Sequence, residues 1–211
     1  MANIITAGNS TNGGTAITTD TSGTLNIVTG SGSGSNAITI DTSQNVVFSG
    51  NVSGVIKSGT AVASTSGTSI DFTGIPSTAK RITVMFNGVS TNGTSIVQIQ
   101  VGSGSASTSG YSSAASYASG AGTFGTATTG FILDTSISAA AANTRYGAVV
   151  LTLLGSNNWV ANGNVNSMNT TVSISISGGS PALAGALDII RITTVGGTNT
   201  FDAGSINILY E

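Results

Sequence analysis

The chain has 211 residues, of which seven are acidic and five basic, for a formal charge of −2. This length is enough for one well-packed β domain and a smaller appendage. Binding to nucleic acid through phosphate contacts needs clustered Lys and Arg, and the one adjacent pair is Lys80-Arg81, so that class of partner is excluded.

The residue types that carry much of enzyme chemistry are missing. The chain contains no cysteine and no histidine, which excludes disulfides, Ser-His-Asp and Cys-His catalysis and the common zinc sites. The first residues lack the basic start and apolar core of a signal peptide, and no apolar run approaches the roughly 20 residues needed to cross a bilayer. We expect synthesis in the cytoplasm and no membrane insertion.

The first 15 residues are mostly Gly, Asn, Ser and Thr, and their one pair of large apolar residues is Ile4-Ile5. Such a segment buries too little apolar surface to order itself. We therefore expect residues 1–15 to form an attachment arm that binds a neighbouring protein through Ile4 and Ile5.

A short unit then occurs twice at an offset of 21 residues. Residues 16–22 read Ala-Ile-Thr-Thr-Asp-Thr-Ser and residues 37–43 read Ala-Ile-Thr-Ile-Asp-Thr-Ser, so six of seven positions agree. β-Branched Ile and Thr favour strands, and Asp-Thr-Ser favours a turn through side-chain to backbone hydrogen bonds. Each copy is predicted to form a strand, a turn and a second strand.

A unit of this size cannot bury its own apolar face, and a stack of repeats normally needs about three or more units to make a core. We therefore predict a β stem over residues 16–56 whose missing partner surface comes from other copies of the chain, as in an intertwined oligomer. Residues 57–68, rich in small residues, are predicted to be a linker.

Longer strand patterns fill residues 69–211. In the segment 96–101 the apolar positions alternate with Gln98 and Gln100, which predicts one buried face and one wet face. Asn92-Gly93 is a hairpin-turn signal. Further strands are predicted at 70–72, 80–86, 131–134, 145–154, 158–168, 170–176, 187–194 and 201–210. This all-β pattern predicts an antiparallel β-sandwich head of the jelly-roll type.

Residues 102–130 form a long excursion that carries Tyr111, Tyr117 and Phe124. A segment of this length without strands is usually functional, or it contains an additional hairpin. Aromatic side chains on such a loop can stack on sugar rings, so these three are candidates for receptor contact. The alternative is that they pack the loop onto the sandwich.

Catalysis would have to rely on carboxylates. A glycosidase needs two of them about 5 to 10 Å apart, and the candidates are Asp20, Asp41, Asp71, Asp134, Asp188, Asp202 and Glu211. The first two occupy equivalent turn positions of the repeat, and the others lie singly near predicted strand ends. We expect no catalytic residue, no metal site and no cofactor.

Two segments resemble parts of phage proteins. Residues 37–54 are similar to repeats of bacteriophage tail fibres and related virion appendages, and residues 74–90, which include Lys80-Arg81-Ile82-Thr83-Val84, resemble a segment that recurs in phage structural proteins. The resemblance implies a homotrimer on the virion surface, made in the cytoplasm of the bacterial host. Its N-terminal region would bind other virion proteins of the tail or capsid.

The same resemblance leaves the role of the C-terminal head open. In the leading interpretation it is the adhesive end of a tail fibre and contacts glycans on the host surface. The alternatives are a head fibre or decoration protein that stabilises the capsid, and a tailspike that degrades polysaccharide.

Overall fold

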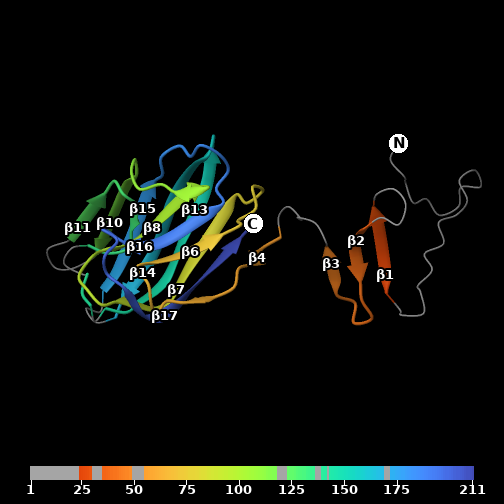
Figure 1. Cartoon of the computed structure of the whole chain (residues 1–211), viewed down its shortest axis with the longest axis horizontal. Coiled ribbons are helices and arrows are strands. Elements are labelled where there is room, and N and C mark those ends of the chain that lie inside the picture. Colours follow the sequence, from red (N-terminus) through yellow and green to blue (C-terminus); the bar gives the residue numbers. More distant parts are fainter. Residues whose placement is uncertain are drawn as a thin grey trace, which may run out of the picture. The chain divides into compact units, whose positions relative to one another are not determined.

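The computed structural model describes residues 24–29, 35–48, 55–117, 123–135, 139–141, 143–168 and 172–211. The chain divides into two units, Met1–Ser53 and Gly54–Glu211, which are described separately (Figure 1). Throughout the described residues the regular elements are β-strands, all strand pairs are antiparallel and no helix occurs. The prediction of an all-β antiparallel protein is confirmed.

The described part of the smaller unit is a three-stranded sheet in the order β1-β2-β3, with β1 at Leu25–Thr29, β2 at Ser35–Ile40 and β3 at Val46–Phe48. The second copy of the repeat forms strand, turn and strand as expected. Asp41 holds the turn, since its Oδ1 accepts hydrogen bonds from the Ser43 and Asn45 amides, both at 2.9 Å. The first copy, residues 16–22, lies outside the described residues.

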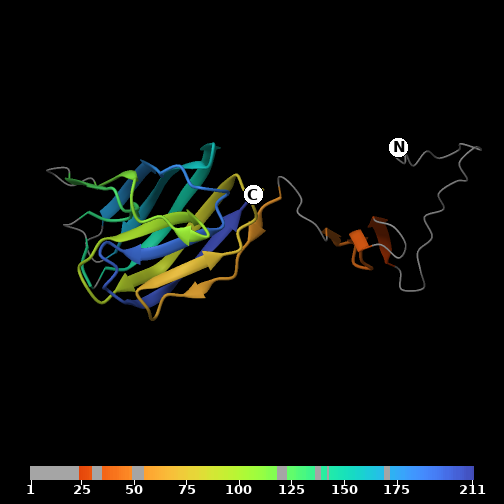
Figure 2. The same ribbon diagram turned by 45° about the horizontal axis from the view of Figure 1, so that its top comes forward.

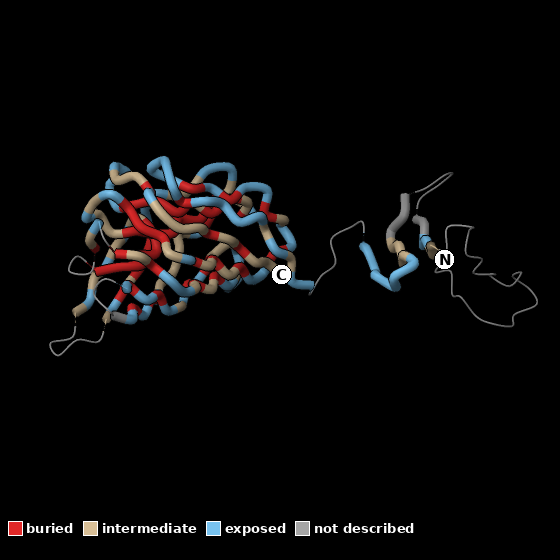
Figure 3. Tube along the Cα trace, turned by 90° about the horizontal axis from the view of Figure 1, so that it is seen from below, coloured by how far each residue is buried: buried red, intermediate tan, exposed pale blue. Residues whose placement is uncertain are grey.

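This small sheet has no core of its own. Side-chain burial is described for residues 24–27 and 38–48 of the unit, and none of these residues is buried (Figure 3). Val46, Val47 and Phe48, the whole of β3, are exposed. A small sheet needs a buried apolar face to be stable by itself in water, and the described side chains of this sheet do not form one.

The larger unit contains a nine-stranded sheet and a five-stranded sheet. The larger sheet has the order β11-β10-β15-β14-β13-β7-β17-β4, with β5 also paired to β17. Its strands are β4 (Lys57–Ser58), β5 (Val62–Ala63), β7 (Arg81–Thr91), β10 (Ser112–Tyr117), β11 (Thr123–Ala127), β13 (Arg145–Gly155), β14 (Asn158–Ser167), β15 (Val172–Gly179) and β17 (Phe201–Tyr210).

The smaller sheet has the order β12-β8-β16-β6, with β9 paired to β8. Its strands are β6 (Ser69–Thr73), β8 (Val97–Ser103), β9 (Ser105–Ala106), β12 (Phe131–Ile132) and β16 (Ile189–Thr194). Figures 1 and 2 show the two sheets as two layers. Side chains from both layers form one hydrophobic core, as in a β-sandwich.

Strand alternation builds this core. On β8, Val97, Ile99 and Val101 are fully buried. On β15, Ile174 and Ile176 are buried, while the serines that alternate with them are exposed. Directly paired residues of an antiparallel sheet lie on the same face. A single run of alternating residues therefore gives each sheet one apolar face, and the two apolar faces meet.

One ion pair is enclosed in the interior. Arg145, at the start of β13, places its Nε 3.0 and 2.9 Å from the two carboxylate oxygens of Asp134, and its Nη2 2.8 Å from Oδ2. Both side chains are fully buried. Burial raises the pKa of Asp134, and the charge of Arg145 opposes that rise. The Val97 amide also donates to Asp134, so the pair links β8 to β13.

The structure differs from the sequence prediction at two connections. Residues 57–68, expected as a linker, carry the short strands β4 and β5, which pair with β17. Asn92-Gly93 does not close a hairpin, because β7 pairs with β13 and β17 in one sheet and β8 pairs with β12 and β16 in the other. Hydrogen bonds between Asn92 and Thr200 hold this crossing between the layers.

The long segment 102–130 was expected to be functional or to contain an additional hairpin, and it contains a hairpin. β10 and β11 pair with each other, and β10 pairs with β15, so the hairpin extends the nine-stranded sheet and β11 forms its edge.

Candidate functional site

The outer face of the nine-stranded sheet carries an uncharged polar surface over β11, β10, β15 and β14. Its first row consists of the directly paired residues Phe124, Ser116, Ser175 and Asn164, and its second row of Thr126, Ala114, Ser177 and Asn162. All are exposed except Ala114, which is half-buried. We call this surface the serine–asparagine face.

The face follows from residues that alternate with the core. On β14, Trp159, Ala161 and Val165 are buried, while Asn162 and Asn164 point outward. The Ser175 hydroxyl donates a hydrogen bond to Asn164 Oδ1 at 2.9 Å, which joins neighbouring strands. Hydroxyl and carboxamide groups both donate and accept hydrogen bonds. The face can therefore bind an uncharged polar partner, but it has no titratable group for acid or base catalysis.

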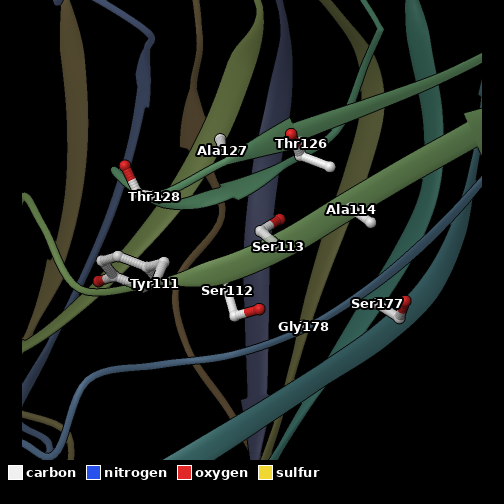
Figure 4. Close-up of a pocket in the computed structure, with 9 residues that line it drawn as sticks. All are labelled: Tyr111, Ser112, Ser113, Ala114, Thr126, Ala127, Thr128, Ser177 and Gly178. Atoms are coloured by element: carbon white, nitrogen blue, oxygen red, sulfur yellow. The ribbon is translucent and has the colours of Figure 1, made fainter.

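A hollow of about 340 Å³ adjoins this face where β10 begins. Figure 4 shows that its small side chains come from β10, β11 and β15, among them Ser112, Ser113, Thr126 and Ser177. Ser113 Oγ already accepts a hydrogen bond from the Ile132 amide at 3.0 Å. This hollow, the serine hollow, is near the lower end of the volumes typical of small-molecule sites.

The three aromatic candidates for receptor contact lie in different environments. Phe124 is 77% exposed on the serine–asparagine face and remains a candidate. Tyr117 pairs with Ile174, whose side chain is buried, and packs against the core.

Tyr111 is only 3% exposed, which corrects its assignment as a contact residue. Its hydroxyl accepts a hydrogen bond from the Val101 amide and lies 3.1 Å from the carbonyls of Val101 and Ser107, while its ring meets Phe131 edge-on at 5.1 Å. Burial raises the pKa of Tyr111 to about 12. Tyr111 therefore fits the packing alternative. The predicted attachment residues Ile4 and Ile5 lie outside the described residues.

The carboxylates in the described part of the chain each have a structural partner. Asp134 pairs with Arg145, Asp71 with Arg191 and Glu211 with Arg81. Asp188 accepts a hydrogen bond from the Gly104 amide and Asp202 one from the Ser90 hydroxyl, while Asp41 holds its turn. No group of three or more potential ligands from His, Cys, Asp and Glu occurs among these described residues. Asp20 lies outside them.

Sequence reasoning missed a second hollow, of about 360 Å³, on the outer face of the five-stranded sheet. Gln98 and Gln100 line it and are only 2% and 5% exposed, so the expectation that they face bulk water is wrong. The loop around Thr129 covers them. The alternation on β8 identified their shared face, but no local signal predicts which distant loop packs over it.

The described residues include no helix that could span a membrane. No family model, no curated protein and no solved structure matches the chain.

Proposed function

We propose that the chain is a non-enzymatic structural protein of a bacteriophage particle. It forms a short trimeric fibre or knob on the virion surface, and its C-terminal unit adheres to the host surface as part of a tail fibre. In this proposal residues 16–56 form a repeat stem shared by three chains, the larger unit is a sandwich of the jelly-roll type, and the N-terminal region binds other virion proteins.

The observation that carries the proposal is the three-stranded sheet of the smaller unit, whose residues of described burial are all at least partly exposed. The second copy of the sequence repeat, residues 37–43, forms the end of β2 and the turn after it, yet none of the residues of this unit with described burial is buried. Other copies of the chain would supply the missing second layer. A thin shared stem of this kind agrees with the resemblance of residues 37–54 to fibre repeats.

The surface of the larger unit supports adhesion. The serine–asparagine face offers hydroxyl and carboxamide groups and the exposed ring of Phe124. Glycans are polyhydroxylated and mostly uncharged, so they are bound by such groups and by stacking on aromatic rings. Each contact of this kind is weak, and three linked heads would raise the overall affinity by multivalency.

The partners of the carboxylates support a role without catalysis. A hydrolase of glycans needs one carboxyl group free to protonate a leaving group and a second one across the bond. Asp71, Asp134 and Glu211 are engaged in ion pairs, and Asp134 is fully buried.

The first test is the mass of the purified full chain by light scattering. We expect three times the chain mass of 20.5 kDa. A folded preparation with the mass of one chain would contradict the shared stem.

The second test is immunogold labelling of intact phage particles, with copies counted against the major capsid protein. Label on the tail at low copy number is expected. Label over the head at high copy number would overturn the adhesive role in favour of capsid decoration. Release of reducing ends from host polysaccharide by the purified protein would identify a tailspike instead.

A further inference from the structure

We propose that the hollow on the outer face of the five-stranded sheet is a binding site for one neutral sugar residue. We call it the glutamine hollow and define it by Gln98, Gln100, Thr108, Thr129, Arg191 and Thr193. That the sugar belongs to a host glycan rests on the proposed function, whereas the existence of the binding site does not.

Buried carboxamides are the first argument. Glutamine is rarely buried, and an outward-facing position on a sheet normally leaves it in water. Here Gln100 Nε2 donates to the Thr129 carbonyl at 2.8 Å, and Gln98 Oε1 accepts from the Thr129 hydroxyl at 2.8 Å. One polar atom of each carboxamide is thus fixed by the protein. The other polar atom of each, Gln98 Nε2 and Gln100 Oε1, provides a donor and an acceptor for a ligand.

The loop over these glutamines is shaped to approach them closely. A Cβ atom at Gly130 would lie 2.8 Å from Gln98 Oε1 and 2.9 Å from the Ile99 carbonyl, so no larger residue fits there without a shift. The absence of a side chain at Gly130 lets Thr129 reach both carboxamides, Gln100 through its carbonyl and Gln98 through its hydroxyl. Groups held in this way lose little further freedom when a ligand binds.

Arg191 is fixed on the same face. It is directly paired with Gln100 on one side and with Asp71 on the other, and its Nε and Nη2 donate to the two Asp71 oxygens at 2.8 and 2.6 Å. Two parallel bonds of this kind hold the guanidinium in one plane. Its Nη1 makes no bond to Asp71, which leaves a further oriented donor at the rim of the hollow.

These groups select the chemical class of the ligand. The Asp71 carboxylate compensates the charge of Arg191, which disfavours an anion such as a phosphate or a carboxylate. None of the residues that line the hollow is aromatic, so a flat base has nothing to stack on. The carboxamides, the guanidinium and the threonine hydroxyls together supply both donors and acceptors. A saturated, uncharged and polyhydroxylated ring fits this set.

The test uses the full-length protein, labelled with ¹⁵N, and titrations with glucose, galactose, mannose and N-acetylglucosamine. The side-chain NH₂ signals of Gln98 and Gln100 report on the hollow directly. We expect at least one sugar to shift these signals with a Kd of the order of 1 mM, which corresponds to about −4 kcal/mol. The proposal is overturned if none of the four sugars shifts them, or if inorganic phosphate or a nucleotide binds there instead.

Two variants and one matched control complete the test. Thr108→Val removes a lining hydroxyl that makes no side-chain hydrogen bond within the described protein, and we expect it to lower the sugar affinity about threefold. Gln98→Leu removes the proposed donor, and we expect it to lower the affinity at least tenfold. Ser175→Ala, on the opposite sheet, should leave the affinity unchanged. Loss of binding in Ser175→Ala alone would move the site to the serine–asparagine face and overturn the proposal.

The outcomes separate this site from the proposed function. Sugar binding by the purified protein together with gold label over the phage head would retain the site and reject the adhesive role. Label on the tail without any sugar binding would retain the adhesive role and reject the site.

Discussion

The two units of this chain have the same secondary structure and very different packing. The described part of the smaller unit has three strands, and none of its residues with described burial is buried, whereas the larger unit encloses a core between two sheets. Both units have β-branched residues and good turns. The difference shows that local sequence makes strands, but a second layer makes a stable domain. In the proposed trimer, other copies of the chain supply that layer to the smaller unit.

The largest effect is expected from truncating the core of the larger unit. Phe131 is fully buried and meets Tyr111 edge-on, so Phe131→Ala should lower the free energy of unfolding by about 3–5 kcal/mol. The matched change in the smaller unit, Val47→Ala, should leave the unfolding of the larger unit unchanged.

If the chain forms the proposed trimer, Val47→Ala should instead reduce the oligomer mass at a given concentration. Urea unfolding and light scattering on the same samples separate the two effects. An equal loss of stability in both variants would contradict the contrast between the units.

Breaking the interior ion pair should destabilise the protein more than breaking the partly exposed one. Arg145→Met leaves Asp134 buried without its partner and should cost about 3–5 kcal/mol, while the double variant with Asp134→Leu should recover much of that loss. Arg191→Met breaks the partly exposed pair with Asp71 and should cost only about 0–1 kcal/mol. Urea midpoints measure all three, and similar losses for Arg145→Met and Arg191→Met would be evidence against this account.

The free energy of unfolding of the larger unit should depend on pH in the alkaline range because of Tyr111. Its pKa is about 12 in the folded protein and near 10 when unfolded, so the unfolded state releases the proton first and stability falls as pH rises from 10 to 12. A shift of this size corresponds to a loss of roughly 2–3 kcal/mol by pH 12.

Tyr111→Phe is the control for that experiment. It should cost about 1–3 kcal/mol at neutral pH, because the Val101 amide loses its acceptor, and it should lack the alkaline loss assigned to Tyr111. Unfolding measured at several pH values in both proteins gives the difference. An identical alkaline loss in the variant would show that another group causes it.

The smallest effect concerns the turn of the smaller unit at acid pH. Hydrogen bonds from Asn45, first from its side chain and then from its amide, lower the pKa of Asp41 below 3.8, and the Ser43 amide adds to this. The contribution of Asp41 to the turn is therefore present at neutral pH and is lost as pH falls through the lowered pKa. The amide signals of Ser43 and Asn45 should titrate with a midpoint below 3.8. A midpoint above that value would show that these hydrogen bonds do not form in solution.

The strands were predictable because apolar and polar residues alternate along the sequence. The runs around Val97 and Ile174 give the correct face for each residue, and the Asp41 turn follows from its residue types. Pairing partners were not predictable in this way. The strands on either side of Asn92-Gly93 pair in different sheets, since each finds long partners elsewhere, and β4 and β5 are too short to give a pattern.

The candidate surfaces were predictable in part. The serines of β15 and the asparagines of β14 alternate with core residues, so their exposure could be read from the sequence. A tyrosine in a segment rich in small residues gives no such signal, and Tyr111 is buried because a distant strand offers its backbone as a partner. The cover over Gln98 and Gln100 likewise comes from Thr129, about 30 residues away in sequence.

Three of the strands at sheet edges, β4, β5 and β12, contain two residues each. An edge that short presents too few free backbone groups to recruit a strand from another molecule. The larger unit is thus protected there against edge-to-edge aggregation. Lengthening these edges with β-branched residues would be a direct route to insoluble protein.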